Sequence, residues 1–218
     1  MKASSITSSD TPLPGLTYLA IMGLLTSIGA LTTDIMLLAL DVLGQDLGVG
    51  DIDQTTLVVM VVFLGMALGQ LVVGPLSDAY GRKSVIIWGY ALFIVGCGRS
   101  MLASDWWLML AARFLQGLGA AGPRVVSVAI VRDEYKERAM ASIMLIIMAI
   151  FILTPIIATL MGQGLIYLGG WHATFAGLML IAVPSALWFA RTNPATLPLD
   201  RRRRLSAASP SPGQSRLP

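Results

Sequence analysis

The sequence predicts an all-α membrane protein with six transmembrane helices, and three observations support this fold class. Hydrophobic residues make up 56% of the 218 residues and charged residues only 12%, with a mean hydropathy of +0.76. Soluble domains average about 25% charged residues. Six apolar runs approach the ~20 residues that cross a bilayer as a helix. The basic residues also fall in every second connection, as they do in multi-pass proteins.

The first three predicted spans cover residues 15–40, 55–76 and 84–102. The first is too long for a cleavable signal peptide, so we expect it to be retained. The connection at 41–54 holds four aspartates and no lysine or arginine. The connection at 74–83 is rich in glycine and charge instead, which predicts a membrane hairpin.

That hairpin loop begins with Gly74 and Pro75 and ends with Lys83. We expect Gly74 to remove a side chain where two helices approach closely, and Pro75 to weaken the helix end. Asp78 could lie near a helix N-terminus, whose free N–H groups favour an anion, and Gly81 permits a tight reversal.

The last three predicted spans cover residues 106–131, 139–165 and 173–190. Trp106 and Trp107 follow a three-residue connection and mark a membrane interface. The predicted domains are therefore a polar N-terminal segment at 1–14, a six-span domain at 15–190 and a disordered basic tail at 191–218. The arginines of this tail could contact anionic lipid headgroups.

The distribution of basic residues predicts the orientation. If six spans alternate, twelve of the fifteen fall on one side, three lie within spans, and the opposite connections have none. By the positive-inside rule both termini are then cytoplasmic, in the cell membrane, which would be the inner membrane of a bacterium. Because the charges are sorted by side, the pI near 9.3 does not indicate nucleic-acid binding.

Two charges within the predicted spans mark a candidate site, because a charged side chain at membrane depth costs about 2.5 kcal/mol or more and usually faces a partner or a water-filled cavity. Asp34 lies about 27 Å along the first span from Leu16, and Arg113 lies about 10 Å below Trp106, at a helical rise of about 1.5 Å. We expect the two to face one cavity at similar depth, either as an ion pair or as separate contacts across water.

The fourth span carries a polar stripe and a set of small residues. Positions spaced by three and four lie on one helix face, and glycines allow helices to pack closely. The stripe consists of Arg113, Gln116, Gly117, Ala120 and Arg124, and the packing glycines are Gly117, Gly119 and Gly122.

Four motifs resemble one family of transporters. Gly-x-Leu-Ser-Asp-x-x-Gly-Arg-Lys at 74–83 resembles the signature loop of the major facilitator superfamily. Arg-x-x-Gln-Gly-x-Gly-Ala at 113–120 is similar to the fourth span of its drug:proton antiporters. Residues 33–40 and 128–133 resemble the bicyclomycin and chloramphenicol resistance branch. The resemblance covers about residues 15–205.

The resemblance implies the N-terminal six-span half of a major facilitator fold, built from two three-helix inverted repeats. It also implies roles for individual residues. A proton- or substrate-binding set would comprise Asp34 and Arg113, to which we add Gln116 and Arg124 from the polar stripe. A cytoplasmic gate would comprise Gly74, Asp78, Gly81, Arg82, Lys83 and Asp133, and helix packing would involve Gly117, Gly119, Gly122 and Pro155.

The sequence also departs from the branch at several positions. Leu38 and Asp41 stand where the first span usually has prolines. The fifth-span signature, normally Gly-Pro, is reduced to Thr154-Pro155. His172 stands after Trp171, where the branch tends to have arginine.

The predicted function is proton-coupled efflux of drugs or small metabolites by antiport. Asp34 would take a proton from outside and release it inside, and its protonation would weaken a bound cation. The expected partners are a small-molecule substrate, protons, the lipid bilayer, and a second six-span half or a second copy of the chain.

Two alternatives remain open. The chain could be a truncated half or a dimerising membrane scaffold that transports nothing, which the Ser- and Pro-rich ending from about Ala207 favours. It could also be a proton-coupled importer, because the motif at 74–83 is shared by importers and exporters. We expect no enzyme activity, cofactor or metal, because the sequence has no nucleophile paired with a base and no phosphate-binding loop, and His172 and Cys97 have no partner of their kind.

Overall fold

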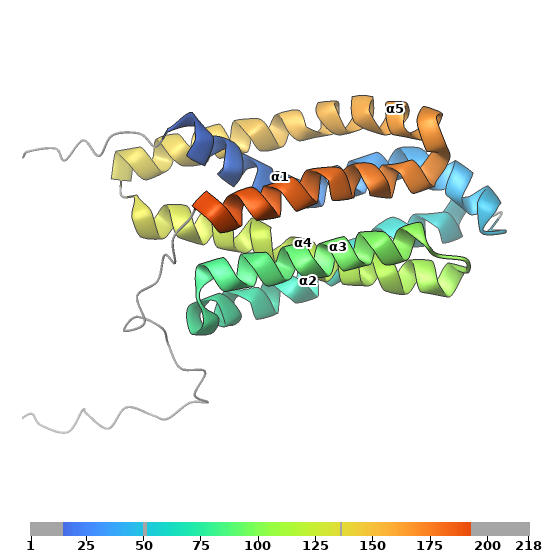
Figure 1. Ribbon diagram of the computed structural model, residues 1–218, viewed down its shortest axis with the longest axis horizontal. Helices are drawn as coiled ribbons and strands as arrows, with labels where there is room; N and C mark the ends of the chain where they lie inside the picture. Colours follow the sequence, from blue (N-terminus) through green and yellow to red (C-terminus); the bar gives the residue numbers. More distant parts are fainter. Residues whose placement is uncertain (1–14, 50–51, 136, 193–218) are drawn as a thin grey trace, which may run out of the picture.

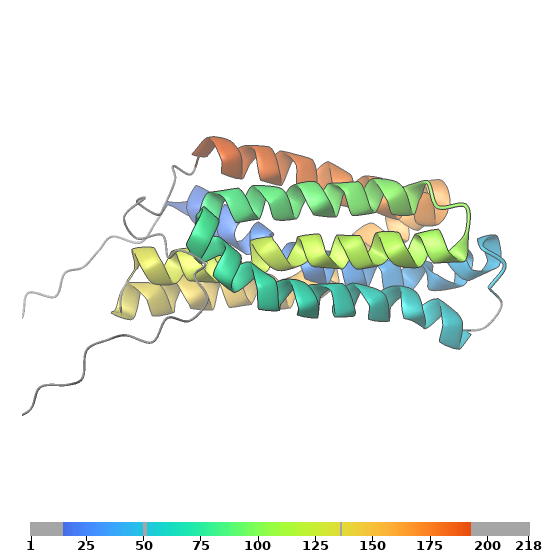
Figure 2. The same cartoon turned by 90° about the horizontal axis from the view of Figure 1, so that it is seen from below.

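The computed structural model describes residues 15–49, 52–135 and 137–192, so the predictions for residues 1–14 and for the tail from 193 onward lie outside it. The described residues form five helices that run lengthwise in one bundle (Figures 1 and 2). These are α1 (Leu16–Asp46), α2 (Ile52–Tyr80), α3 (Arg82–Met101), α4 (Trp106–Glu134) and α5 (Glu137–Thr192).

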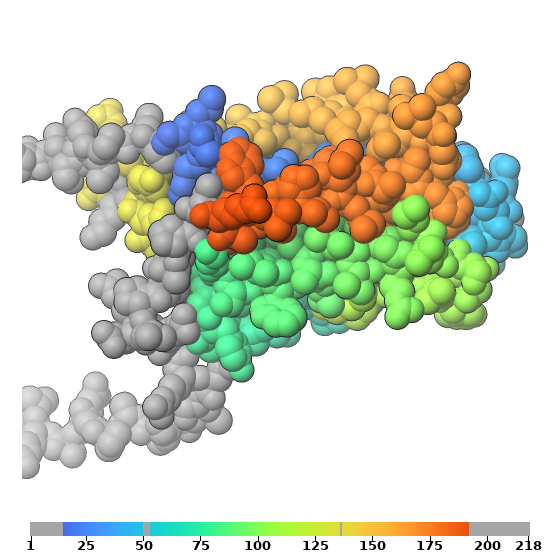
Figure 3. Space-filling view, viewed as in Figure 1, coloured from blue at the N-terminus to red at the C-terminus, as the bar shows by residue number. Residues whose placement is uncertain are grey.

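All five helices are long and apolar enough to cross a membrane. A helix satisfies its backbone N–H and C=O groups internally, which a chain in lipid requires. Large apolar side chains also remain exposed along α2 and α5, including Leu71, Leu145 and Ile152, which are 74%, 71% and 71% exposed. The two parts of α5, coloured yellow-orange to red, cover much of the face that Figure 3 shows. The predicted multi-pass helical class is confirmed.

The predicted count of six spans is not confirmed as six separate helices, because the fifth and sixth spans belong to one element, α5. The backbone of α5 leaves the helical conformation at Gly169 and Gly170. Gly170 has φ 61° and ψ −155°, a region that only glycine enters readily. Beyond this break the chain turns from orange to red and runs back along the bundle (Figure 1).

The helices extend further than the sequence predicted, because their ends were placed at the ends of the apolar runs. The helix α1 continues to Asp46, so Asp41 and Asp46 lie on it and not in a connection. Of the predicted loop at 74–83, only Gly81 lies outside a helix, and its φ of 93° suits glycine. The helix α2 passes through Pro75, which removes only one hydrogen bond near its end. Helices extend past the apolar segment because their polar ends can remain in water.

The helix α4 lies between α2 and α3 at backbone-to-backbone distance. On the α2 side, a Cβ atom added to Gly117 would overlap the carbonyl oxygen of Val62, and one on Gly69 would lie 3.0 Å from the carbonyl oxygen of Leu118. On the α3 side, a Cβ atom on Gly96 would lie 2.7 Å from the backbone nitrogen of Gln116. Glycines on all three helices therefore make this packing possible.

The other packing residues predicted on α4 have similar surroundings. A Cβ atom on Gly119 would overlap the backbone nitrogen of Phe93, and one on Gly122 would lie 3.2 Å from the carbonyl oxygen of Val85. Both neighbours belong to α3.

Two predicted packing residues were wrong. A Cβ atom on Gly74 would meet no heavy atom within 4 Å among the described residues, so Gly74 does not mark a close approach of helices. Pro155 is exposed, because it lies on the face of α5 turned away from α1. The preceding Thr154 makes the contact instead, since its hydroxyl lies 2.9 Å from the hydroxyl of Ser27.

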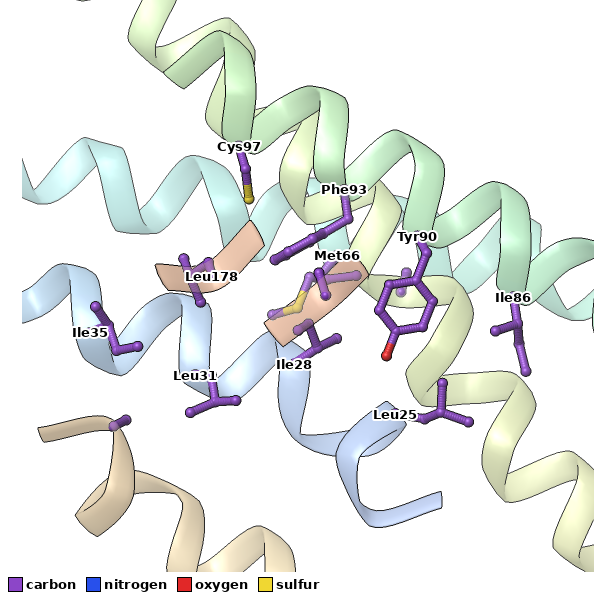
Figure 4. Close-up of a cluster of buried hydrophobic side chains, with 14 of the residues drawn as sticks. Leu25, Ile28, Leu31, Ile35, Met66, Ile86, Tyr90, Phe93, Cys97 and Leu178 are labelled. Atoms are coloured by element: carbon purple, nitrogen blue, oxygen red, sulfur yellow. The ribbon is translucent and has the colours of Figure 1, made fainter. Parts of the chain in front are cut away.

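The first part of α5 runs parallel to α1 in a constant register. Gly23 lies beside Ile150, Ser27 bonds to Thr154, and Ile35 lies beside Gly162. Partners in these pairs are 127 residues apart. On its other side α1 contributes Leu25 and Ile28 to the central cluster of buried side chains, which Tyr90, Phe93 and Leu178 complete (Figure 4).

The glycine contacts give a prediction for stability. G117A should lower the free energy of unfolding by about 1–3 kcal/mol, because the added methyl group forces α2 and α4 apart. G98A is the matched control, since a Cβ atom on Gly98 meets nothing within 4 Å in the described structure. It should be neutral or slightly stabilising, because alanine favours a helix over glycine by about 1 kcal/mol. Thermal unfolding in detergent tests this, and equal midpoints for the two variants would contradict it.

Candidate functional site

Arg113 is a fully buried cation in the middle of the bundle. Its side chain has 0% exposure. The guanidinium Nε donates to the carbonyl oxygen of Val58 on α2 at 3.4 Å, and Nη1 donates to Oε1 of Gln116 at 2.6 Å. The Cζ atom also lies over the ring of Phe175 on α5, 5.5 Å from its centroid. Three helices therefore surround this one charge.

No carboxylate within 4 Å balances Arg113 among the residues that the structure describes, and Nη2 has no hydrogen-bond partner there. The sequence predicted that Arg113 faces a water-filled cavity together with Asp34, but the guanidinium lies within packed helices. Its charge is held by a carbonyl dipole, an amide and an aromatic face, because α4 packs too tightly against its neighbours to leave it exposed.

Gln116 extends this contact to α3. Its Nε2 lies 2.9 Å from the sulfur of Cys97, and both side chains are buried with 0% exposure. Arg113 and Gln116 lie three residues apart on α4, so one helical turn brings them together as the sequence indicated. The structure thus confirms that they share one helix face, and it adds the hydrogen bond between their side chains.

Asp34 lies on α1 and is partly exposed. The contacts of Gly29 with Met66 and of Gly44 with Thr55 show that α1 and α2 run antiparallel. Interpolating between these contacts puts Asp34 level with a point about four residues from Val58, or ~6 Å at the helical rise. Asp34 and Arg113 therefore lie at similar depths, although no ion pair joins them in the described part of the chain.

Arg124 lies about three turns beyond Arg113 on α4 and is half-buried. Its Cζ atom lies 5.3 Å from the centroid of the Phe151 ring on α5. The two arginines of the predicted stripe thus face aromatic rings on different parts of α5, and the structure does not bring them to one site.

At one end of the bundle, Arg82 joins α2, α3 and α4. Its Nη2 lies 3.1 Å from Asp78, its Nε lies 3.1 Å from Asp133, and its Nη1 donates to the hydroxyl of Ser77 at 2.7 Å. The Arg82 side chain is 14% exposed, whereas the two carboxylates are 47% and 45% exposed. The predicted gate residues Asp78, Arg82 and Asp133 therefore meet, and Gly81 makes the turn between α2 and α3.

A second contact at this end joins α1 to α4. The hydroxyl of Tyr18 donates to Oε2 of Glu134 at 2.6 Å, and the rings of Tyr18 and Tyr135 meet edge to face with centroids 5.9 Å apart. Burial and the carboxylate of Glu134 raise the pKa of the Tyr135 phenol. The consecutive acids Asp133 and Glu134 thus bind residues of two different helices, α3 and α1.

Sequence reasoning missed the surroundings of the charged groups. Val58, Cys97 and Phe175 touch the Arg113–Gln116 pair but lie 55, 19 and 62 residues from their partners in the chain. Apolar residues at those distances carry no local signal of contact. In the sequence, the depth estimate for Asp34 and Arg113, the polar stripe of the fourth span and the motif at 113–120 pointed to the region.

This arrangement can hold charge inside the bundle and tie helix ends together. A partly exposed carboxylate at membrane depth can exchange a proton, whereas a fully buried guanidinium is held in place by its amide and aromatic neighbours. The described residues include no group of three or more metal-ligating side chains.

Comparisons with known proteins agree with this architecture. The chain is 33% identical over 185 residues to the MFS-type transporter YdgK of Bacillus subtilis, which covers 84% of this chain and 46% of that protein. It is also 33% identical over 150 residues to the multidrug resistance protein MdtL of Shigella flexneri and of Escherichia coli, covering 69% of this chain and 38% of theirs. The chain thus spans less than half the length of these relatives.

A solved structure shows the same fold. The human organic anion transporter MFSD10 (TETRAN) superimposes with a TM-score of 0.63 at 20% sequence identity, over 86% of this chain and 49% of that one. The family model of the Major Facilitator Superfamily matches residues 19–217. Nearly all of the chain therefore fits one family, and the chain belongs to the major facilitator superfamily.

Proposed function

We propose that these residues form the N-terminal six-span half of a proton-coupled transporter that exports drugs or small metabolites by antiport. The observation that carries the proposal is Asp34, a partly exposed carboxylate within a candidate membrane span. Ionisable groups at membrane depth are costly and usually serve transport. The similarity to MdtL, a multidrug resistance protein, supports a drug-like substrate.

The break at Gly170 supports six crossings. It divides α5 into segments at 137–168 and 171–192, each long enough for one crossing at roughly 20 residues. With six crossings, the basic residues gather on one side, which would be the cytoplasmic face of a bacterial inner membrane.

The relatives' length supports a further partner. Because the chain covers 46% of YdgK and 38% of MdtL, a complete transport path would need a second six-span half or a second copy of the chain. The substrate would then bind between the halves, next to Asp34.

In this mechanism Asp34 binds either a proton or a cationic substrate. A proton from the outside would neutralise the carboxylate and release the cation, and loss of the proton to the cytoplasm would restore the binding site. Arg113 would contribute a fixed positive charge at similar depth, and the cluster around Arg82 would close the cytoplasmic side.

The role of Asp34 predicts pH-dependent binding. The fluorescent cation ethidium should bind the purified chain in lipid nanodiscs more tightly as rising pH deprotonates Asp34. D34N should weaken binding by about tenfold or more and remove its pH dependence, because a desolvated charge partner is lost. D41N, which changes an exposed aspartate on the same helix, should keep both. Unchanged binding by D34N would overturn the role of Asp34, and absence of binding by the unaltered chain would favour a half that transports nothing.

The orientation predicts where α5 ends. A green fluorescent protein fused after Arg191 should fluoresce in the cytoplasm, because six crossings return the chain to the side of the Arg82 cluster. Alkaline phosphatase fused at the same point should be inactive. If instead the phosphatase is active there, both the six crossings and the positive-inside orientation are wrong.

The gate proposal predicts that Arg82 stabilises the helix ends. R82Q should lower the free energy of unfolding by about 1–2 kcal/mol, because it removes two ion pairs and the hydrogen bond to Ser77. R99Q makes the same charge change on an exposed side chain at the other end of α3 and should have little effect. Thermal unfolding at low and high salt measures both, and equal destabilisation by the two variants would rule out the clustered ion pairs.

A further inference from the structure

A line of side-chain contacts runs from the end of α1 to the buried arginine. Asp46, in the last turn of α1, accepts a hydrogen bond at 2.8 Å from Nε1 of Trp171, which directly follows the break in α5. The rings of Trp171 and Phe175 meet edge to face, at 88° with centroids 6.1 Å apart. The Phe175 ring in turn lies under the guanidinium of Arg113.

The burial of these groups makes the line rigid. Trp171 is 2% exposed, and Phe175 and Arg113 are 0% exposed, so none of the three can rotate without displacing a packed neighbour. The α1 end of the line differs from its buried part. Asp46 is exposed, and the ring of His172 stacks on Trp171 with centroids 3.5 Å apart while its own side chain is exposed.

The glycine break explains how Trp171 reaches the interior. An uninterrupted helix cannot reverse direction, whereas the conformation of Gly170 turns the chain at this point. Trp171 then packs inward as the first residue of the returning segment. Its indole N–H would be unsatisfied there without an acceptor, and Asp46 supplies one.

Arg113 depends on this arrangement more than a paired arginine would. In the described structure it has no carboxylate partner, so the Phe175 face supplies part of the stabilisation that a counterion would give. If Phe175 turned, the guanidinium would lose that contact, and its bond to Gln116 would loosen.

We propose that Asp46, Trp171 and Phe175 are positioning residues for Arg113, so that a hydrogen bond at the end of α1 sets the geometry of the buried Arg113–Gln116 pair. The proposed function gives Arg113 its importance, whereas the contacts themselves do not depend on transport. Two aromatic side chains, Trp171 and Phe175, thus connect a surface carboxylate to a buried cation.

The single cysteine of the chain provides a probe at the far end of this line. The sulfur of Cys97 lies 2.9 Å from Gln116 Nε2, is 0% exposed and points into the interior in Figure 4. Its alkylation by a membrane-permeant maleimide therefore reports opening around Gln116. Any other reactive thiol is absent from the sequence.

The experiment compares alkylation rates in membranes. D46A should speed alkylation of Cys97 about tenfold, because an unsatisfied indole N–H frees Trp171 and the opening spreads to Gln116. D46N keeps an acceptor oxygen and should restore the rate to within about twofold of the unaltered chain. W171F removes the donor and should match D46A.

Two controls separate this line of contacts from general loosening. Y18F breaks an interhelical hydrogen bond of similar length at the opposite end of α1, and it should leave the rate for Cys97 unchanged. F175L should speed alkylation by itself and abolish any further effect of D46A, since both act along one line.

Several outcomes would overturn the inference. The first is a D46A variant that unfolds at a lower temperature but alkylates Cys97 at an unchanged rate. The second is a Y18F variant that speeds alkylation as much as D46A does. The third is a double variant in which the effects of D46A and F175L on the rate add. Because the readout is thiol exposure in the chain itself, a failed ethidium-binding experiment would refute the proposed function and leave this result unaffected.

Discussion

The close approach of α4 to α2 and α3 is the constraint on which the rest of the structure depends. Glycines let the backbones touch, and a single methyl group at Gly117 or Gly119 would collide with the neighbouring helix. In a membrane, apolar side chains gain little by leaving lipid for protein, so dense packing of small residues has to supply the attraction. The same packing buries Arg113 fully.

This packing determines the chemistry of the site. A guanidinium enclosed by helices needs partners from the protein, and it finds a carbonyl, an amide and a phenyl ring. Asp34 differs because it lies on a partly exposed face of α1. The two charges therefore have different roles in the proposed mechanism, one exchanging protons and the other remaining fixed.

The helix ends are held by polar contacts of another kind. At one end, consecutive acids on α4 bind Arg82 and Tyr18, and at the other end Asp46 binds Trp171. These contacts lie where water competes, so each contributes modestly. Their main effect is on geometry, because each contact fixes the position of one helix end relative to another.

The membrane class, the approximate spans, the family motifs, and the placement of Arg113 and Gln116 on one helix face followed from the sequence, because they depend on hydropathy and on spacing within one helix. The groups that surround the charges depend instead on how distant helices pack. Phe175, Val58 and Cys97 come from other helices, and an apolar side chain carries no mark of its distant neighbour. The tertiary structure also moved the close-packing role away from Gly74 and Pro155, because whether a small residue packs depends on which helix lies opposite it.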